Sequence, residues 1–273
     1  MQDKFNMSRE LSVALAKRSV IDSIWKSARL EGLAVTFPQT ERIYEGYVPE
    51  GTSVQTVLVI NNLKHAWQFI FDTLDYEFDY PYLSQLNQLV SQGVTHRAGV
   101  IRSIDVQIGG TTWKPTIPHL ENVKEDLQNI LTSQNSITER AIDLMLYCMR
   151  SQIFLDGNKR TAMLAANQYL IQNGKGAIAV PEAILQEFRV HLIKFYETND
   201  SATIKQFIWE KCLVGSQEPA VRQTEEPLGT EYFIKKSREN AKRKGITSTC
   251  DEEIEQCNHM QFFQLGGFNE YNV

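Results

Sequence analysis

Apolar residues recur at helical spacing through most of the first 215 residues, and this periodicity constrains the fold more than any other feature of the chain. In residues 8–31 the apolar side chains fall close to one helical face, and Gly32 is a natural stop. For the next periodic segment, residues 54–74, two interpretations stay open: the spacing of its apolar residues fits a helix, and its apolar start fits a strand. The same pattern predicts helices over residues 54–74, 81–93, 118–132, 137–152, 158–173, 181–197 and 201–213. The periodicity as a whole predicts a mainly α fold.

Residues 104–113 break this pattern, because apolar and polar residues alternate there around a pair of glycines. Gly109 and Gly110 can adopt the positive φ angles that a tight hairpin turn needs. We therefore predict one small β-hairpin within an otherwise helical chain.

The composition changes near Gly215, where apolar residues become few and Glu, Gln, Pro and Gly predominate. Such a stretch is typical of a linker, and a charged segment and an aromatic tail follow it. We predict an N-terminal helical region (1–80), a core (81–215), and a linker with a small C-terminal extension (216–273).

Bulk properties exclude several classes of protein. The formal net charge of -5 gives no electrostatic reason to expect nucleic acid as a partner. No apolar run approaches the length that spans a membrane, and the first residues lack the apolar stretch of a signal peptide. The 4 cysteines are too few and too scattered for a disulfide framework, so we expect a cytoplasmic protein. The oligomeric state stays open, a dimer included.

The segment between two predicted apolar helices, residues 152–161, carries the most chemistry. A turn at Asp156 and Gly157 precedes the second helix, whose N-terminus presents free N–H groups and partial positive charge. Asp156 is a hard oxygen ligand suited to Mg²⁺ that bridges to phosphate. Three residues add hydrogen-bond donors and positive charge: Asn158, Lys159 and Arg160. These features predict a nucleotide or polyphosphate site. A second interpretation stays open, in which Asp156 is an ordinary N-cap and Arg160 a surface charge.

The same segment resembles the signature of the Fic family, His-x-Phe-x-Asp/Glu-Gly-Asn-Gly/Lys-Arg-x-x-Arg. The matching positions are Phe154, Asp156, Gly157, Asn158 and Arg160. The form Asn-Lys-Arg, with Lys159, is that of the Doc-like branch. The resemblance extends from about residue 8 to 213, because the glycine-pair hairpin and the segment 195–200 stand in the family's order.

This resemblance implies a Fic-like helical bundle with a small β-hairpin flap, which binds ATP or another nucleotide together with Mg²⁺. Asp156 would hold the metal, and the phosphates would lie against Gly157, Asn158, Lys159 and Arg160. The family's usual reaction transfers AMP from ATP to a protein hydroxyl, whereas the Doc branch transfers the γ-phosphate. A protein target would pair with the flap as an added strand. The flap residues implied in this docking are Val106, Ile108, Gly109, Gly110, Thr111 and Thr112.

The chain departs from the signature at two positions. Gln152 stands where the family has its histidine, and Met163 stands where it has a second arginine. An imidazole can take a proton from an attacking hydroxyl at neutral pH, whereas a glutamine amide can only form hydrogen bonds. We therefore expect impaired transfer, or else a catalytically silent regulatory protein that binds a nucleotide or a partner.

A second resemblance lies near the N-terminus. Ser27, Glu31 and Gly32 match the Ser/Thr-x-x-x-Glu-Gly/Asn pattern of the family's inhibitory helix. In the family this glutamate pairs with the second arginine and blocks the γ-phosphate site. With Met163 there instead, Arg160 or Lys159 would have to take that role. The other interpretation is a surface glutamate at a helix end.

Overall fold

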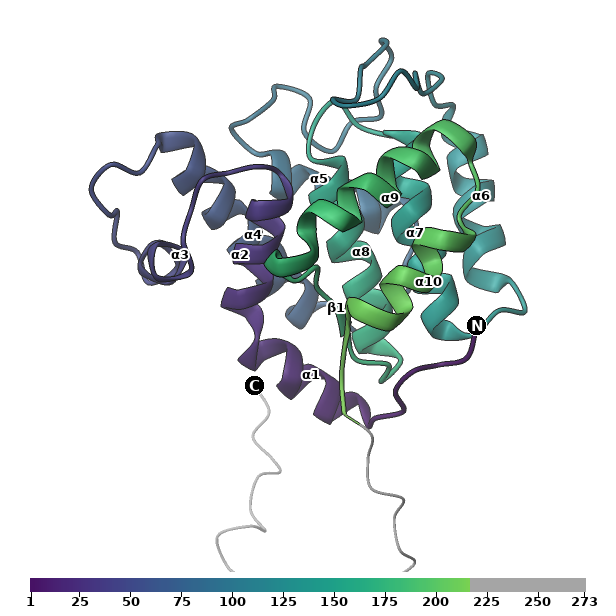
Figure 1. Ribbon diagram of the computed structural model, residues 1–273, viewed down its shortest axis with the longest axis horizontal. Coiled ribbons are helices and arrows are strands. Elements are labelled where there is room, and N and C mark those ends of the chain that lie inside the picture. The colour runs from purple at the N-terminus through teal and green to yellow at the C-terminus, as the bar shows by residue number, and fades with distance from the viewer. Residues whose placement is uncertain (217–273) are drawn as a thin grey trace, which may run out of the picture. The chain divides into compact units, whose positions relative to one another are not determined.

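Helices α7 (Ile137–Ser151) and α8 (Asn158–Gln172) lie at the centre of the structure, a computed structural model that describes residues 1–216 (Figure 1). Twelve of the 15 residues of α8 are buried, because other helices cover it on every side. Three alanines at its middle, Ala162, Ala165 and Ala166, are buried and leave room for close approach of α7. The 152–161 segment forms the short loop between these two helices and the first turn of α8.

The remaining helices surround this pair. Helices α1, α2, α4 and α5 pack against α8, whereas α6 and α10 pack against α7. Their bounds are α1 Arg9–Arg18, α2 Val20–Leu30, α3 Phe37–Tyr44, α4 Val54–Asp72, α5 Tyr80–Ser91, α6 Leu120–Thr132, α9 Leu185–Thr198 and α10 Ala202–Lys211. A 3-10 turn, Glu182–Ile184, precedes α9. The described residues thus contain ten α-helices, and the predicted mainly α fold is confirmed.

One predicted helix needs correction, one helix was not predicted, and one strand alternative is excluded. The segment 8–31 forms two helices, α1 and α2, because the Ser19 hydroxyl donates to the carbonyl oxygens of Leu15 and Ala16 and the chain turns there. Helix α3 was not predicted, although the sequence carries its signal. Thr36 and Gln39 form a capping box, and a proline stands in the first turn. Residues 54–72 are helical throughout, so the strand interpretation of that segment is wrong.

The β-hairpin predicted around Gly109 and Gly110 is not formed, and the β-sheet of the structure lies elsewhere in the chain. Strands β1 (Ala177–Ile178) and β2 (Leu213–Val214) form a two-stranded antiparallel sheet that the sequence did not predict. The chain does turn at Gly109 and Gly110, but no strand ladder joins the two arms of the turn. This stretch belongs to the long loops between α5 and α6, at the top of Figure 1.

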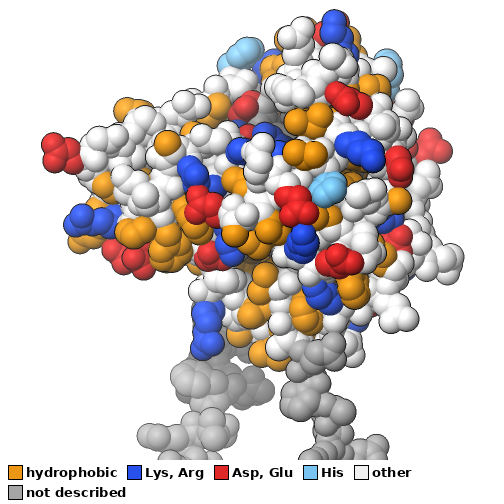
Figure 2. All heavy atoms as spheres, in the orientation of Figure 1, with side chains coloured by type: hydrophobic (Ala, Val, Ile, Leu, Met, Phe, Trp, Pro, Cys, Tyr) orange, Lys and Arg blue, Asp and Glu red, His pale blue; other side chains and the backbone are white. Residues whose placement is uncertain are grey.

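Within residues 1–216, no helix combines the length and the apolar character that crossing a bilayer requires. On the face shown in Figure 2, basic and acidic side chains are interspersed and do not gather by sign. The predicted linker and extension, from residue 217 onward, lie outside the described residues.

Arg102 ties the loop that carries the glycine pair to the end of α7. Arg102 is only 1% exposed, and burial lowers the pKa of its guanidinium. The guanidinium donates to five main-chain oxygens, those of Ile104, Pro115, Thr116, Ser151 and Gln152. A planar group with five donors can serve this many acceptors, which an ammonium group cannot.

The change Arg102→Lys is therefore expected to lower the free energy of unfolding by about 2–4 kcal/mol, because several buried carbonyls lose their donor. Urea denaturation measures the change. Arg97→Lys is the control, since the Arg97 side chain makes one hydrogen bond, to Ser103 Oγ, in an exposed position. Equal effects of the two substitutions would contradict the role given to Arg102.

Candidate functional site

The α7–α8 loop begins and ends on residues with positive φ. Gln152 has φ 47°, which is uncommon outside glycine and turns the chain sharply away from α7. Gly157 has φ 75° and is the N-cap of α8. A Cβ at Gly157 would lie 2.5 Å from Ser91 Oγ and 2.9 Å from Val90 Cγ1, so only glycine fits there. Within residues 1–216 no side chain caps α8, and its first N–H groups are therefore open to a ligand.

Asn158 braces the loop from inside. Its Oδ1 accepts from the main-chain N–H of Phe154 at 3.0 Å, and its Nδ2 donates to the carbonyl oxygen of Phe154 at 2.8 Å. The same Nδ2 donates to Gln152 Oε1 at 3.1 Å. Phe154 and Asn158 are both buried. The Asn158 side chain thus shapes the loop and has little capacity left for a ligand.

Two buried polar residues of α5 hold the loop from the other side. Asn87 Nδ2 donates to the carbonyl oxygen of Asp156 at 2.9 Å and to Thr161 Oγ1 at 3.1 Å. Ser91 Oγ also donates to the Asp156 carbonyl oxygen, at 3.2 Å. Neither residue was predicted from the sequence. Their signal was a polar side chain at an inward position of an apolar helix, which is informative because buried polar groups require partners.

Asp156 and Arg160 form an ion pair over the first turn of α8. Arg160 Nη2 lies 2.7 Å from Asp156 Oδ2. The Arg160 side chain is 6% exposed, whereas the Asp156 side chain is 40% exposed. The interpretation of Asp156 as an N-cap and Arg160 as a surface charge is therefore wrong.

Glu31, at the C-terminal end of α2, also reaches this turn. Its Oε1 lies 3.3 Å from Arg160 Nε, and its Oε2 lies 3.2 Å from Lys159 Nζ. The Glu31 side chain is only 20% exposed, so it is not a surface glutamate. The cations that pair with Glu31 are thus Lys159 and Arg160, whereas Met163 is buried in the core.

The end of α2 is itself anchored. Arg189 Nη2, from α9, donates to the carbonyl oxygens of Arg29 and Leu30 at 3.0 and 3.2 Å. Ser27 and Gly32 are the other two residues that match the inhibitory-helix pattern. Ser27 is buried, and Gly32 has φ 88° directly after Glu31. Burial raises the pKa of the nearby Tyr196 hydroxyl, and the negative charge of Glu31 adds to this effect.

The flap residues lie on the loop above the bundle. Among the described residues, no main-chain hydrogen bond joins Val106 to Thr112 with other backbone groups. Thr111 Oγ1 donates to Glu197 Oε1 at 3.1 Å, and Ile108 packs against the core. Gly109 and Gly110 are exposed at the tip. The backbone of this loop is thus open to pairing, while Arg102 connects its base to Gln152.

A metal at this site would have one carboxylate from the protein. Residues 1–216 hold no group of three or more potential ligands among His, Cys, Asp and Glu. One Asp156 carboxylate, partly exposed, fits Mg²⁺ that arrives with phosphate oxygens and water, and does not fit a dedicated metal cage.

Comparison with known proteins agrees with this arrangement. Residues 77–170, which include α5, α7 and the α7–α8 loop, match the model of the Fic/DOC family. The chain contains a Fic/DOC family domain. Over 251 residues it is 22% identical to a Drosophila yakuba protein named protein adenylyltransferase Fic, which covers 84% of this chain and 50% of that protein. The chain thus spans about half the length of that relative.

Solved structures share the Fic/DOC fold of this chain. Fic-1 of C. elegans, residues 134–508, has a TM-score of 0.62 at 20% identity, over 76% of this chain and 64% of that chain. A Fic domain containing signaling protein from Bacteroides thetaiotaomicron has a TM-score of 0.58 at 18% identity, over 68% and 75%. A Fic family protein from Desulfovibrio desulfuricans has a TM-score of 0.60 at 15% identity, over 74% and 64%. These likenesses establish the fold.

Proposed function

We propose that the Fic/DOC domain binds Mg·ATP at Asp156–Arg160 and transfers AMP to a hydroxyl of a protein target, at a rate that Gln152 lowers. The observation that carries the proposal is the carboxylate of Glu31, which Lys159 and Arg160 hold jointly beside the uncapped N-terminus of α8. A carboxylate held by two cations at a helix N-terminus stands in for a phosphate.

Different groups of the loop and of α8 would bind the phosphates and the metal ion of a nucleoside triphosphate. The N–H groups of the first turn of α8 and the two cations would bind phosphate oxygens. Asp156 would hold Mg²⁺, which neutralises phosphate charge during transfer. The ion pair between Asp156 and Arg160 keeps both side chains at the mouth of the site.

Gln152 explains why transfer would be slow. Its Nε2 donates to the carbonyl oxygen of Met149, and its Oε1 accepts from Asn158. An amide has no accessible protonation step, so it cannot take the proton of the attacking hydroxyl. Loss of a positioned general base costs about 10²–10⁴ in rate.

Glu31 would regulate the same site. A phosphate that binds Lys159 and Arg160 competes with the Glu31 carboxylate, because both anions require the same donors. The helix end that carries Glu31 must therefore move or turn its side chain before a triphosphate binds. We propose that α2 acts as an inhibitory helix in this sense.

The target would dock at the flap. The main chain of residues 106–112 has no backbone partner among the described residues, so an extended segment can pair with it. Because Arg102 links the base of the flap to Gln152, a docked segment would lie near the motif.

A second candidate is a binding module without catalysis. The observation in its favour is that both ends of the Gln152 amide are already engaged. A third candidate is transfer of the γ-phosphate, because Lys159 gives the motif the Asn-Lys-Arg form of the Doc-like branch.

One assay separates these functions: the protein is incubated with Mg²⁺, cell lysate and ATP labelled at either the α- or the γ-phosphate. AMP transfer predicts slow labelling of protein from the α-phosphate alone. Labelling from the γ-phosphate alone would replace the proposal by phosphate transfer. Binding of Mg·ATP without any label on protein would replace it by the binding module.

A further inference from the structure

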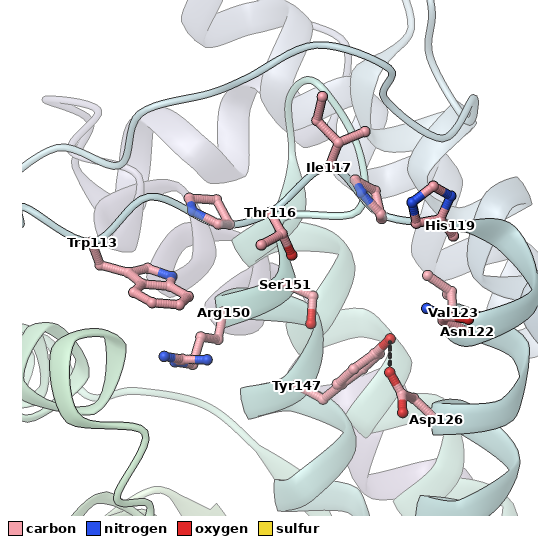
Figure 3. A pocket seen from close by; sticks show the side chains of 12 residues that line it. Trp113, Thr116, Ile117, His119, Asn122, Val123, Asp126, Tyr147, Arg150 and Ser151 are labelled. Carbon is pink, nitrogen blue, oxygen red and sulfur yellow. Dashed lines mark hydrogen bonds between the residues drawn. The ribbon is translucent and has the colours of Figure 1, made fainter.

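A cavity of about 340 Å³ lies beside α7, away from the phosphate site (Figure 3). Its walls come from α6, from the last turns of α7, and from the loop that follows the flap. Figure 3 shows Trp113 and Arg150 together at one side, Tyr147 and Asp126 at the other, and Ser151 between them.

Arg150 brings an unneutralised charge to this cavity. Its guanidinium carbon lies 3.8 Å from the centre of the Trp113 ring, and its Nε donates to the carbonyl oxygen of Tyr196 at 3.2 Å. Within residues 1–216, no acidic side chain lies within ion-pair distance of Arg150. Burial lowers the pKa of this guanidinium, which nevertheless stays charged at any physiological pH. The hydrogen bonds of the Arg150 side chain within residues 1–216 leave its two terminal nitrogens without a protein acceptor.

Trp113 supplies a second donor without an acceptor. Its indole Nε1 is buried and has no hydrogen-bond partner among the described residues. Buried donors are normally paired, and an unpaired one requires an explanation. Trp113 and Arg150, which lie against each other, thus both have donors without a protein acceptor in the described part of the chain.

The acidic end of the cavity does not supply it. Asp126 Oδ2 accepts from the hydroxyl of Tyr147 at 2.9 Å, and this contact together with burial raises the pKa of Tyr147. Asp126 lies across the cavity from Arg150 and is already engaged (Figure 3).

The rim of the cavity holds exposed side chains, apolar as well as polar. Ile117 lines it and is exposed, and Leu120 stands one residue after His119, another lining residue. Exposed apolar side chains around a polar pocket are typical of a surface that binds protein.

We propose that this cavity binds the side-chain carboxylate of an Asp or Glu residue in a polypeptide that docks on the rim. The carboxylate would accept two parallel hydrogen bonds from the Arg150 terminal nitrogens, and a bond from the buried Trp113 indole would require the wall of the cavity to open. Because Arg150 and Ser151 directly precede Gln152, the polypeptide would be the protein target; this last step rests on the proposed function, whereas carboxylate binding does not.

The test uses the indole N–H signals in a nitrogen-15 NMR spectrum of the full chain, which has four tryptophans. Trp113→Phe assigns the Trp113 signal and keeps an aromatic ring under Arg150. The probe is N-acetylglutamate methylamide, and N-acetylglutamine methylamide is its neutral isostere. No nucleotide is added, so failure here is distinguishable from failure of the proposed transfer reaction.

We expect the glutamate probe to shift the Trp113 signal saturably, with a Kd on the order of 10 mM for so small a ligand. Arg150→Gln should weaken this binding at least about 10-fold while the other three indole signals stay in place, which shows that the variant is folded. An equal response to the glutamine probe, an unchanged response in Arg150→Gln, or no saturable shift would overturn the proposal.

Discussion

Replacement of Gln152 by histidine is expected to raise AMP transfer by about 10²–10⁴-fold, the usual contribution of a positioned general base. The donors for phosphate stay in place, and only the group that takes the hydroxyl proton changes. The measurement is the initial rate of labelling from α-phosphate-labelled ATP. It is made in the Glu31→Gly background for both residues at 152, so that the closed phosphate site does not mask the gain.

The backbone accommodates this substitution. Gln152 has φ 47°, a conformation that histidine adopts more readily than most residues. One imidazole nitrogen can donate to the carbonyl oxygen of Met149, as the Gln152 amide does, and the other nitrogen is then the acceptor for the proton of the hydroxyl. Gln152→Asn is the control, because asparagine tolerates the same φ but cannot take a proton. A folded histidine variant no faster than the asparagine variant would count against the missing base as the cause of slow transfer.

Removal of the Glu31 side chain is expected to tighten Mg·ATP binding by about 5–150-fold, the range of typical coupling energies between competing states. Glu31→Gly frees the Lys159 and Arg160 donors that its carboxylate occupies. Titration calorimetry of Mg·ATP into wild type and variant measures the change.

Glu45→Gly is a closely matched control. Glu45 is the C-cap of α3 with φ -77° and ψ -6°, as Glu31 is the C-cap of α2 with φ -74° and ψ -6°, and a glycine of positive φ follows each. Glu45 is exposed and takes part in no ion pair of the described residues, so its loss reports the backbone effect alone. Similar ATP affinity in wild type and Glu31→Gly would leave Glu31 without a regulatory role.

Most helices were predictable because their apolar residues repeat at helical spacing over ten residues or more. The same periodicity could not show the break at Ser19, which depends on one hydroxyl that bonds backward to the preceding turn. Helix α3 is only 8 residues long, too short for a periodic signal, although its capping box was visible. The sheet of β1 and β2 joins residues more than 30 positions apart through two-residue strands, which local pattern does not reveal.

The motif was predictable as a set of residues but not as a set of contacts. Sequence placed Asp156, Lys159 and Arg160 at a helix N-terminus, and the structure has them there. Sequence did not show that Asn158 turns inward to brace the loop, or that Glu31 pairs with both cations. The Glu31 pairings connect residues more than 100 positions apart and depend on how the helices pack.

The extended arms around Gly109 and Gly110 were expected to pair with each other. The carbonyl oxygens of Ile104 and Thr116, on either side of this stretch, instead accept from the guanidinium of Arg102, and a buried arginine at that position has no periodic signature. A tertiary contact therefore replaced the local hairpin that the alternation predicted.

The most direct test of the phosphate site is amide hydrogen exchange in the Glu31→Gly chain, with and without Mg·ATP. Our account predicts that nucleotide slows exchange at the first-turn amides of α8, Gly157 to Arg160, which no side chain caps in the free protein. Tight binding of Mg·ATP with unchanged exchange at these amides, and protection elsewhere, would contradict it.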